Sequence, residues 1–186
     1  LDGLTGPLNE KQQRYLVRMS DNSDRLVRMI EDLLDRTRIE TGRLEVHPAD
    51  VEIEPCLADV IEQLKPLAQA KQQSLEFHCA GTDVVVWADR DRLIQTVVNL
   101  VQNAIKFTPP GGTVSVACEL LTHRRAMVLV RDTGPGIAPE YLDKIFDPFF
   151  RIQQGQRTAP KGLGLGLSIV KTLVELQGGE VAACNR

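Results

Sequence analysis

Two asparagines and a lysine share one face of a predicted helix, and their side chains suit metal and phosphate binding. Asn99, Asn103 and Lys106 follow one another at helical spacing, and the opposite face of the same segment is apolar. Asparagine is a poor helix former in mid-helix, so two of them indicate more than a solvated polar face, which is the alternative interpretation. An amide oxygen can ligate a hard cation such as Mg²⁺ without adding negative charge beside phosphates.

A second segment that could contact a ligand is residues 132–137 (DTGPGI), which directly follows a predicted strand. Gly134 and Gly136 would let the backbone approach a bound molecule closely. Asp132, at the end of the strand, could accept a hydrogen bond from an exocyclic amine. Taken alone, however, the segment is more typical of an ordinary Gly-Pro turn.

Three phenylalanines fall within residues 146–150 (FDPFF), in a chain with only 4% aromatic residues. We expect this cluster to be a hydrophobic anchor for a loop. Arg151 follows it directly and could reach a phosphate, because a guanidinium offers several donors in a planar fork.

The fourth segment, residues 161–168 (KGLGLGLS), opens a predicted helix. Backbone N–H groups at a glycine-rich helix start form an anion-binding site. The segment is not a P-loop, because the pattern G-x-x-x-x-G-K-[ST] is absent. A dinucleotide fingerprint should follow a strand, whereas this segment follows a polar stretch at 152–161. By itself the glycine spacing does not identify the ligand.

A long helix is predicted ahead of these segments. Asn9 and Gln12 form a capping-box pattern, the helical pattern continues to about Thr41, and Gly42 is typical of the residue after a helix. A heptad pattern predicts that this helix packs along others in a bundle and is not stable alone. The residues of the pattern are Leu16, Met19, Ser23, Leu26, Ile30, Leu33 and Thr37.

The rest of the chain predicts a mixed α and β domain after a connector that contains Pro48 and Pro55. Helices are expected at 56–72, from the N-cap Asp89 to about Phe107, at 138–145 and at 163–177. Strands are expected at 74–79, 84–88, 113–121, 126–131 and 180–184. The third and fourth strands would form a hairpin.

The composition of the 186-residue chain excludes several other classes of protein. Its net charge of −3 gives no electrostatic footprint for nucleic acid, and no apolar run approaches the length that spans a bilayer. The cysteines at 56, 79, 118 and 184 form no C-x-x-C pair, and His78 and Cys79 would point to opposite faces of a strand. We therefore expect reduced, mostly buried thiols and no metal site among them.

In this order and at these separations, the four segments resemble the N box (99–107), G1 box (132–137), F box (146–151) and G2 box (161–168) of histidine kinases. These kinases share a wider family with gyrase-type ATPases and Hsp90-type chaperones. Residues 35–44 (DRTRIETGRL) also resemble the exit of the second dimerisation helix in those kinases. The resemblance covers essentially the whole chain and points to a sensor histidine kinase of a two-component system.

The resemblance implies an α+β fold. The expected architecture is a two-layer α/β sandwich, the Bergerat ATP-binding fold, in which helices cover a mixed sheet, preceded by one long bundle helix. Residues 1–47 would be the end of the dimerisation and phosphotransfer domain, and residues 48–186 the catalytic ATP-binding domain. The family would add at least one more strand after Arg186, so the last strand is expected to be missing.

The resemblance also implies roles at a site for ATP and Mg²⁺. Asn103 would ligate Mg²⁺, Asn99, Lys106 and Arg151 would lie near the phosphates as the catalytic set, and Asp132 would hold the adenine amino group. Further contacts would come from Gly134, Gly136 and Ile137 at the adenine, from Phe146 and Phe149 beneath a lid at 152–161, and from Lys161, Gly162, Leu163, Gly164, Leu165, Gly166 and Leu167 around the phosphates.

By resemblance, the phosphoryl group of ATP would pass to a histidine and then to an aspartate of a response-regulator receiver domain. The intact protein would be a homodimer through a four-helix bundle, either cytoplasmic or the cytoplasmic portion of a membrane-anchored sensor. The three histidines of the chain all lie outside the bundle helix, at His47, His78 and His123. The acceptor histidine is therefore expected N-terminal to Leu1.

One position separates a kinase from a hydrolase. Gyrase-type and chaperone-type relatives have a glutamate one helical turn before the metal-binding asparagine, whereas this chain has Asn99. A neutral amide cannot take a proton from water, so we expect slow ATP hydrolysis. An ATPase of that type is the weaker alternative, and a scaffold that binds ATP without phosphorylating itself stays open.

Overall fold

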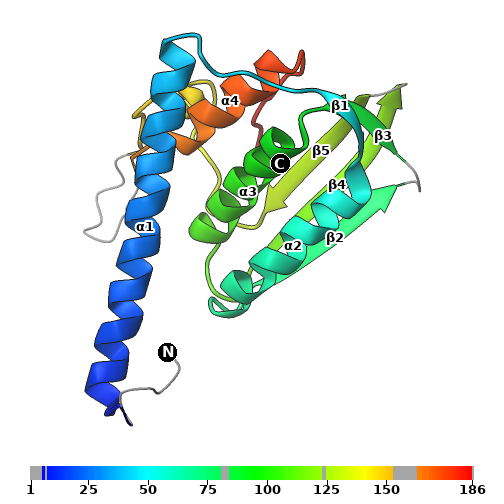
Figure 1. Cartoon of the computed structure of the whole chain (residues 1–186). Helices are drawn as coiled ribbons and strands as arrows, with labels where there is room; N and C mark the ends of the chain where they lie inside the picture. The colour runs from blue at the N-terminus through cyan, green and yellow to red at the C-terminus, as the bar shows by residue number, and fades with distance from the viewer. Residues whose placement is uncertain (1–5, 7, 81–83, 123–124, 153–162, 186) are drawn as a thin grey trace.

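The structure, a computed structural model, describes residues 6, 8–80, 84–122, 125–152 and 163–185 (Figure 1). A long helix, α1 (Glu10–Glu40), stands beside a domain in which helices cover a sheet. The order of helices and strands confirms the predicted α+β fold with one long preceding helix. In the described parts of the chain, no helix is long and apolar enough to cross a membrane.

Helix α1 begins and ends at the residues expected from its sequence. The Asn9 side chain accepts from the Gln12 N–H and the Gln12 side chain accepts from the Asn9 N–H, both at 2.9 Å, which completes the capping box. At the other end Gly42 adopts a φ of +64°, and its N–H donates to the carbonyl of Ile39. This left-handed residue ends the helix at little steric cost because glycine has no Cβ.

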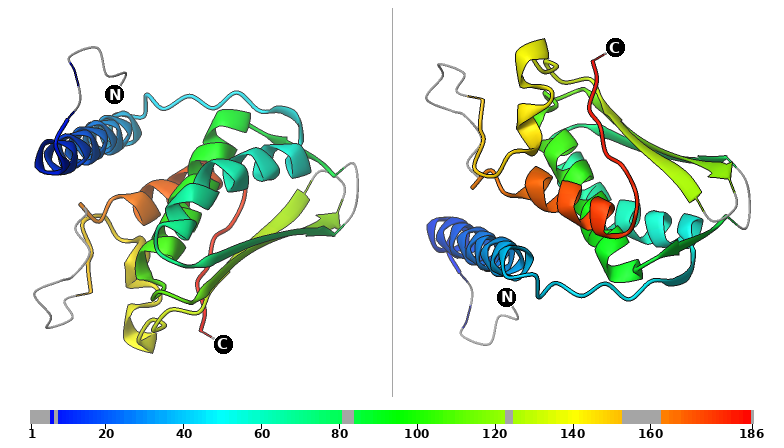
Figure 2. Two further views of the ribbon diagram at one scale, coloured as in Figure 1. Left: turned by 90° about the horizontal axis from the view of Figure 1, so that it is seen from below. Right: turned by 90° about the horizontal axis from the view of Figure 1, so that it is seen from above.

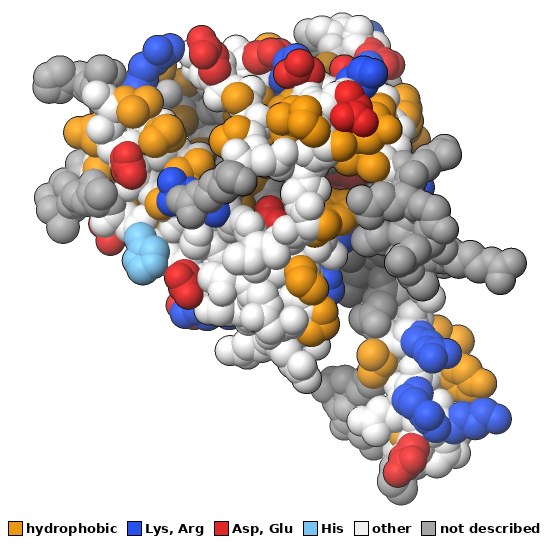
Figure 3. Space-filling model, turned by 180° about the vertical axis from the view of Figure 1, so that it is seen from behind, with side chains coloured by type: hydrophobic (Ala, Val, Ile, Leu, Met, Phe, Trp, Pro, Cys, Tyr) orange, Lys and Arg blue, Asp and Glu red, His pale blue; other side chains and the backbone are white. Residues whose placement is uncertain are grey.

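The predicted bundle face of α1 is open to solvent in the single chain. Leu26 is 60% exposed and Leu33 is 54% exposed, although both would be buried in a bundle. Hydrophobic and basic side chains lie together on the part of α1 that projects from the domain (Figure 3). The large exposed hydrophobic residues of the helix are Tyr15, Val17, Met19, Leu26, Val27, Ile30, Leu33 and Leu34.

In the part of the chain that the structure describes, five strands form two sheets. Strand β2 (Ser74–Ala80) pairs in parallel with β4 (Thr113–Thr122), and β4 pairs antiparallel with β5 (Arg125–Asp132), so the larger sheet is mixed. Strands β1 (Ala49–Glu52) and β3 (Val85–Ala88) form a separate antiparallel pair. The four strands predicted between residues 74 and 131 are confirmed, as is the hairpin of β4 and β5.

Helices α2 (Ile53–Gln69) and α3 (Arg90–Phe107) cover one face of the larger sheet, and α4 (Gly166–Leu176) packs against α3 (Figures 1 and 2). Alternate residues of β4 point to these helices and are fully buried, so one apolar core joins the two layers. Its most buried members include Leu57, Val60, Val97, Val101, Ile105, Val114, Val116 and Cys118.

Several predicted boundaries were wrong. Strand β1 lies in the predicted connector, and α2 begins at Ile53 and ends at Gln69 rather than spanning 56–72. The predicted helix at 138–145 is two 3₁₀ turns, at Pro139–Tyr141 and Lys144–Phe146. Helix α4 begins three residues later than expected. The expected strand at 180–184 is absent, because the described residues 180–185 have no ladder pairing and run as irregular chain.

Helix α1 contacts the domain through its last turns. Ile39 and Leu44 pack against Leu165, Ile169 and Leu173, which belong to α4 and the residue before it. Beside this apolar contact, Asp35 is only 7% exposed and accepts a hydrogen bond from the side chain of Gln95 on α3. The end of α1 is therefore held by both α3 and α4.

Candidate functional site

Helix α3 positions the first group of predicted site residues. Asp89 caps its first turn by accepting from the N–H groups of Asp91 and Arg92, at 3.0 and 3.2 Å. The apolar face of the helix is buried in the core, which leaves Asn99, Asn103 and Lys106 half-buried on the other side. The Lys106 ammonium lies 4.9 Å from the centroid of the Phe107 ring.

The capping residue Asp89 also ties the connector to the domain. Its carboxylate accepts from the backbone N–H of His47 at 2.8 Å, in addition to the two N–H groups of α3. Burial alone would raise the pKa of Asp89, but the hydrogen bonds from His47, Arg92 and Asp91 lower it below its usual value. This carboxylate is therefore held ionised at the start of the helix that carries the site.

The start of α4 lies against the polar face of α3. A Cβ built on Gly166 would lie 3.5 Å from Oδ1 of Asn99, so the first turn of α4 approaches this asparagine closely. Leu165, the residue before α4, is 1% exposed. The side chain of Leu165 therefore packs in the protein, whereas the first N–H groups of α4 have no partner within the helix and can bind an anion.

Gly164 joins the 161–168 segment to the aromatic segment. It adopts a φ of +75°, and a Cβ built there would lie 2.8 Å from the carbonyl oxygen of Phe150. The N–H of Phe149 donates to the carbonyl of Gly164 at 2.9 Å. Only glycine fits this conformation and this close approach without strain. Backbone contacts therefore hold the two segments together.

The three phenylalanines differ in burial. Phe146 is 9% exposed, and the ring of Phe150 lies 5.7 Å from that of Tyr141, measured between centroids. The side chain of Phe149, which was expected to be an apolar anchor, is instead 60% exposed. Its backbone has a left-handed φ of +63°. Phe146 and Phe150 thus provide the apolar packing, while Phe149 contributes a backbone hydrogen bond. Arg151 beyond them is exposed.

The turn after β5, which Asp132 begins, brings Gly134 beside the end of α3. Oδ1 of Asp132 accepts from the N–H of Gly134 at 2.8 Å, which closes a small side-chain turn. A Cβ built on Gly134 would lie 3.3 Å from the carbonyl oxygen of Phe107, so this turn packs tightly on the last turn of α3. Glycine is required at position 134 because a side chain would have no room there, and not because the backbone has a positive φ.

Gly136 and Ile137 contact the C-terminal residues of the chain. Gly136 has a φ of +72°, and the N–H of Ile137 donates to the side chain of Asn185 at 2.9 Å. The Asn185 amide donates in return to the carbonyl of Ile137. No sequence pattern singles out Asn185, because an isolated asparagine near the end of this stretch has no periodic or motif context.

Two further residues near the site also lacked a sequence signal. Lys71 and Gln73 lie between α2 and β2, and their side chains bind the carbonyls at the end of α3.

Of the residues predicted from the 161–168 segment, Lys161 and Gly162 lie outside the described residues, as does most of the expected lid. Leu163 is 40% exposed, and Leu167 is half-buried.

The site thus gathers segments that are far apart in the sequence around one end of the domain. Asn99, Gly166 and Gly164 lie in one connected group, and Gly134 adjoins Phe107 at the end of the same helix. No three His, Cys, Asp or Glu side chains in the described parts of the chain cluster as metal ligands. A Mg²⁺ that binds together with phosphates needs only one or two protein ligands, so the amide of Asn103 suits that ion.

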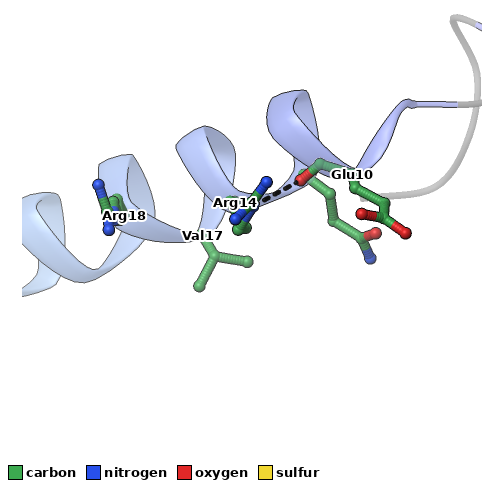
Figure 4. Close-up of a pocket in the computed structure, with 5 residues that line it drawn as sticks. Glu10, Arg14, Val17 and Arg18 are labelled. Atoms are coloured by element: carbon green, nitrogen blue, oxygen red, sulfur yellow. Dashed lines mark hydrogen bonds between the residues drawn. The ribbon is translucent and has the colours of Figure 1, made fainter.

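A separate hollow lies along α1, away from these segments (Figure 4). It is lined by Glu10, Gln13, Arg14, Val17 and Arg18, all from the first turns of one helix. A trough on a single helix face has no converging polar groups from other elements, so it lacks the form of a small-molecule site.

Two family models match the chain. A model described as "Histidine kinase-, DNA gyrase B-, and HSP90-like ATPase" matches residues 88–186, and one described as "His Kinase A (phospho-acceptor) domain" matches residues 1–42. The stretch 1–42 contains no histidine, since the first histidine of the chain is His47.

Curated relatives are sensory kinases. The chain is 38% identical to the adaptive-response sensory kinase SasA of Synechococcus elongatus over 83% of its own length and 39% of that protein. It is 34% identical to the sensor histidine kinase AtsR of Burkholderia thailandensis over 96% of its length and 30% of that protein. The chain therefore spans well under half the length of these two relatives.

Solved structures of histidine kinases have the same fold. Full-length ShkA in complex with AMPPNP is 31% identical and matches 97% of this chain and 37% of its own, with a TM-score of 0.76. Histidine kinase ThkA in complex with the response regulator protein TrrA is 25% identical and matches 97% of this chain and 49% of its own, with a TM-score of 0.71.

Proposed function

This chain belongs to the sensor histidine kinases, and from that premise we propose that it transfers the γ-phosphoryl group of Mg-ATP to a histidine. The observation that carries the proposal is the meeting of α3 and α4. There Asn99 lies against Gly166, at a helix start whose N–H groups can bind phosphate. Phosphoryl transfer depends mainly on positioning the reactants and on neutralising the negative charge of the phosphates. The residues where α3 meets α4 offer groups for both tasks.

The proposed roles follow from where each group lies. Asn103 would hold Mg²⁺, which would neutralise phosphate charge, and Lys106 and Arg151 would bind the phosphates. Asp132 uses one carboxylate oxygen for the N–H of Gly134, which leaves the other able to accept from the adenine amino group. Gly166 would leave room for a phosphate beside Asn99, and Gly164 lets the backbone of Phe149 and Phe150 approach the start of α4.

In the proposed reaction a neutral imidazole nitrogen attacks the γ-phosphorus. The bond from phosphorus to the β,γ-bridging oxygen breaks, ADP leaves, and a phosphorus–nitrogen bond forms on the histidine. The phosphorylated ring then releases the proton on its other nitrogen to solvent. The residues of this chain act by holding ATP in line for the attack and by offsetting negative charge.

We place the acceptor histidine N-terminal to Leu1. Residues 1–42 match the phospho-acceptor model but contain no histidine. His47 follows the end of α1 in the connector, and its backbone N–H is tied to Asp89 at the start of α3. A residue bound to the start of the ATP-binding domain is poorly placed to act as the acceptor of a helical bundle. His47 is nevertheless the competing acceptor within the chain.

We also place the boundary between the two domains at residues 47–48. The strand β1, which follows at once, pairs with β3, and α2 packs against α3 and β2, so both belong to the ATP-binding domain. The proposed partners of the intact protein are a second copy, through the helical bundle, and a response-regulator receiver domain. The reaction would take place in the cytoplasm, with or without a membrane anchor elsewhere in the protein.

The test uses the full-length protein that contains this chain and ATP labelled in the γ-phosphate. We expect labelled protein whose phosphate is lost in acid and kept in base. Asn103→Asp should abolish the label, because a carboxylate replaces the neutral ligand beside the phosphates. Gln63→Glu makes the same amide-to-carboxylate change at an exposed position of α2 and should leave the label intact.

Two further variants separate the parts of the proposal. His47→Ala should keep the label, and its loss would move the acceptor from the upstream helix to the connector. Gly164→Ala should abolish the label, whereas Gly42→Ala should not, although both glycines have a positive φ. Only at Gly164 would the added Cβ meet neighbouring backbone. Unlabelled wild-type protein that nevertheless binds ATP would favour the scaffold over the kinase.

A further inference from the structure

Two side chains from the turn between α2 and β2 hold the C-terminal end of α3. Nζ of Lys71 donates to the carbonyl oxygens of Ile105 and Lys106, at 2.7 and 3.0 Å. Nε2 of Gln73 donates to the carbonyl oxygen of Ile105 at 3.1 Å and to that of Thr108. We call these two side chains, with the carbonyls that they bind, the α3 clamp.

The α3 clamp meets a general requirement of helix ends. The last carbonyls of a helix lack partners within the helix, and this end carries partial negative charge. The Lys71 ammonium supplies both donors and a positive charge. Gln73 is only 6% exposed, and burying an amide is costly unless it forms hydrogen bonds. Its Nε2 donates to two carbonyls, while its Oε1 is buried without a partner among the described residues, so the donor side of the amide fixes its place in the fold.

Backbone hydrogen bonds join the same two turns. The N–H of Gly111 donates to the carbonyl of Gln72 at 2.9 Å, and the N–H of Ser74 donates to the carbonyl of Gly112 at 3.0 Å. Gln72 itself has a positive φ of 57°. The turn that carries Lys71 and Gln73 is therefore fixed to the turn that follows α3, and neither can shift alone.

The clamped turn of α3 borders two parts of the candidate site. It contains Lys106, and Phe107 beside it lies against Gly134 of the turn after β5. The N–H of Thr133 in that turn donates to the carbonyl of Thr113 at 3.1 Å, just beyond the clamped segment. A shift in the last turn of α3 would thus move Lys106 and the proposed adenine pocket relative to each other.

We propose that Lys71 and Gln73 are positioning residues for ATP: they set the distance between the phosphate-binding end of α3 and the adenine-binding turn at 132–137. The inference rests on the proposed function, since it concerns the same site. In this proposal the two side chains act on backbone carbonyls and not by contact with the nucleotide. Lys71 acts through the carbonyls of Ile105 and Lys106, and Gln73 acts through those of Ile105 and Thr108.

The first test measures the binding of Mg-ATP to the 186-residue chain by calorimetry. Lys71→Met keeps the aliphatic stem but removes the charged donor, so we expect the Kd for ATP to rise about tenfold, the scale of one lost charge-assisted hydrogen bond. Lys71→Arg keeps a cation with several donors and should restore most of the affinity. Lys65→Met removes a lysine of α2 that pairs with Glu62 and should leave binding unchanged.

A second readout separates positioning from a loss of folding. In nuclear magnetic resonance spectra without nucleotide, Lys71→Met should shift the amide signal of Gly134, although residue 71 forms no hydrogen bond with Gly134. Lys65→Met should leave the Gly134 signal unchanged. Unchanged ATP affinity in Lys71→Met would overturn the inference. So would lost affinity that follows only from unfolding at the measurement temperature. Wild-type chain that binds no ATP would instead overturn the proposed function.

Discussion

Asn99 is the single residue that bears most directly on whether the site hydrolyses ATP. Its amide oxygen faces the start of α4, where a carboxylate could otherwise act as a general base on water. We predict slow ATP hydrolysis by the wild-type chain and a rise of at least about tenfold in Asn99→Glu, well within the usual contribution of a general base. Phosphate release measures the rate. Asn99→Gln gives a side chain of similar length without a base, so an equal rise in that variant would contradict the argument.

The capping carboxylate Asp89 makes a pH-dependent contribution to stability. Its pKa is lowered in the folded chain because hydrogen bonds from His47, Arg92 and Asp91 outweigh the effect of burial. The pKa of an aspartate in an unfolded chain is about 4. Because the pKa of Asp89 is lower in the folded chain, its ionised carboxylate stabilises the fold fully above the unfolded-state pKa, and this stability is lost as the pH falls through the folded-state pKa. Asp89→Asn should therefore lower the melting temperature at pH 7, with the difference from wild type shrinking below about pH 4.

The control for this titration is Asp59, an exposed carboxylate that pairs with Arg90 across 3.7 Å. Exposed ion pairs contribute little, so Asp59→Asn should be nearly neutral at pH 7. A difference between Asp89→Asn and wild type that persists unchanged to low pH would show that the lost interaction is not the ionised cap.

At the scale of the element, most helices and strands could be predicted because their signals are local. The caps Asn9 and Asp89 fixed the starts of α1 and α3, and Gly42 fixed the end of α1. Strand β1 was missed because a four-residue strand is defined by its pairing with β3, which no local pattern reveals. The strand expected at 180–184 failed for the same reason, since its residues have suitable composition but no ladder partner.

For the candidate site too, features with a local sequence signal could be predicted, and features set by tertiary contacts could not. The types, order and spacing of the residues in the four motifs could be read from the sequence, and the structure describes where these motifs lie except for Lys161 and Gly162. The exposure of Phe149 could not be predicted, because it depends on a backbone contact with Gly164 that spans the intervening segment. Lys71 and Gln73 were missed because their role is to bind carbonyls, and every residue presents the same carbonyl regardless of its type.

The contact between α1 and α3 depends on a small buried polar network. Asp35 accepts from Gln95, and Arg92 lies 3.8 Å from the same carboxylate. Asp35→Ala would leave Nε2 of Gln95 without its acceptor, which costs about 1–3 kcal/mol for a buried group, whereas Arg92 keeps its hydrogen bond to Oε1 of Gln95. We expect faster amide hydrogen exchange in the last turns of α1, whereas Asp35→Asn, which keeps an acceptor oxygen, should have a smaller effect. Exchange that is unchanged in Asp35→Ala would mean that the apolar contact of Ile39 and Leu44 suffices.

At the scale of the whole molecule, α1 presents a hydrophobic face that the domain leaves uncovered. Leu26 and Ile30 are 60% and 50% exposed on the predicted bundle face. Such a face is stabilised when helices of two chains pack together, because apolar side chains leave water at about 25 cal/mol per Å². We predict that the full-length protein sediments as the proposed dimer, and that Leu26→Lys combined with Ile30→Lys converts it to a monomer in sedimentation velocity.

Leu67→Lys is the matched control for the dimer, because Leu67 is a 44% exposed leucine on α2, outside the bundle helix. It should leave the proposed dimer intact, and ATP affinity should be equal in all of these variants because the proposed nucleotide site uses residues of one chain. A doubly substituted protein that stays dimeric would place the interface elsewhere. If it became monomeric and also lost ATP binding, the two domains would be coupled through the Asp35 contact rather than acting as separate modules. Combining these substitutions with Asp35→Ala would then distinguish the two possibilities, since uncoupled domains give additive effects.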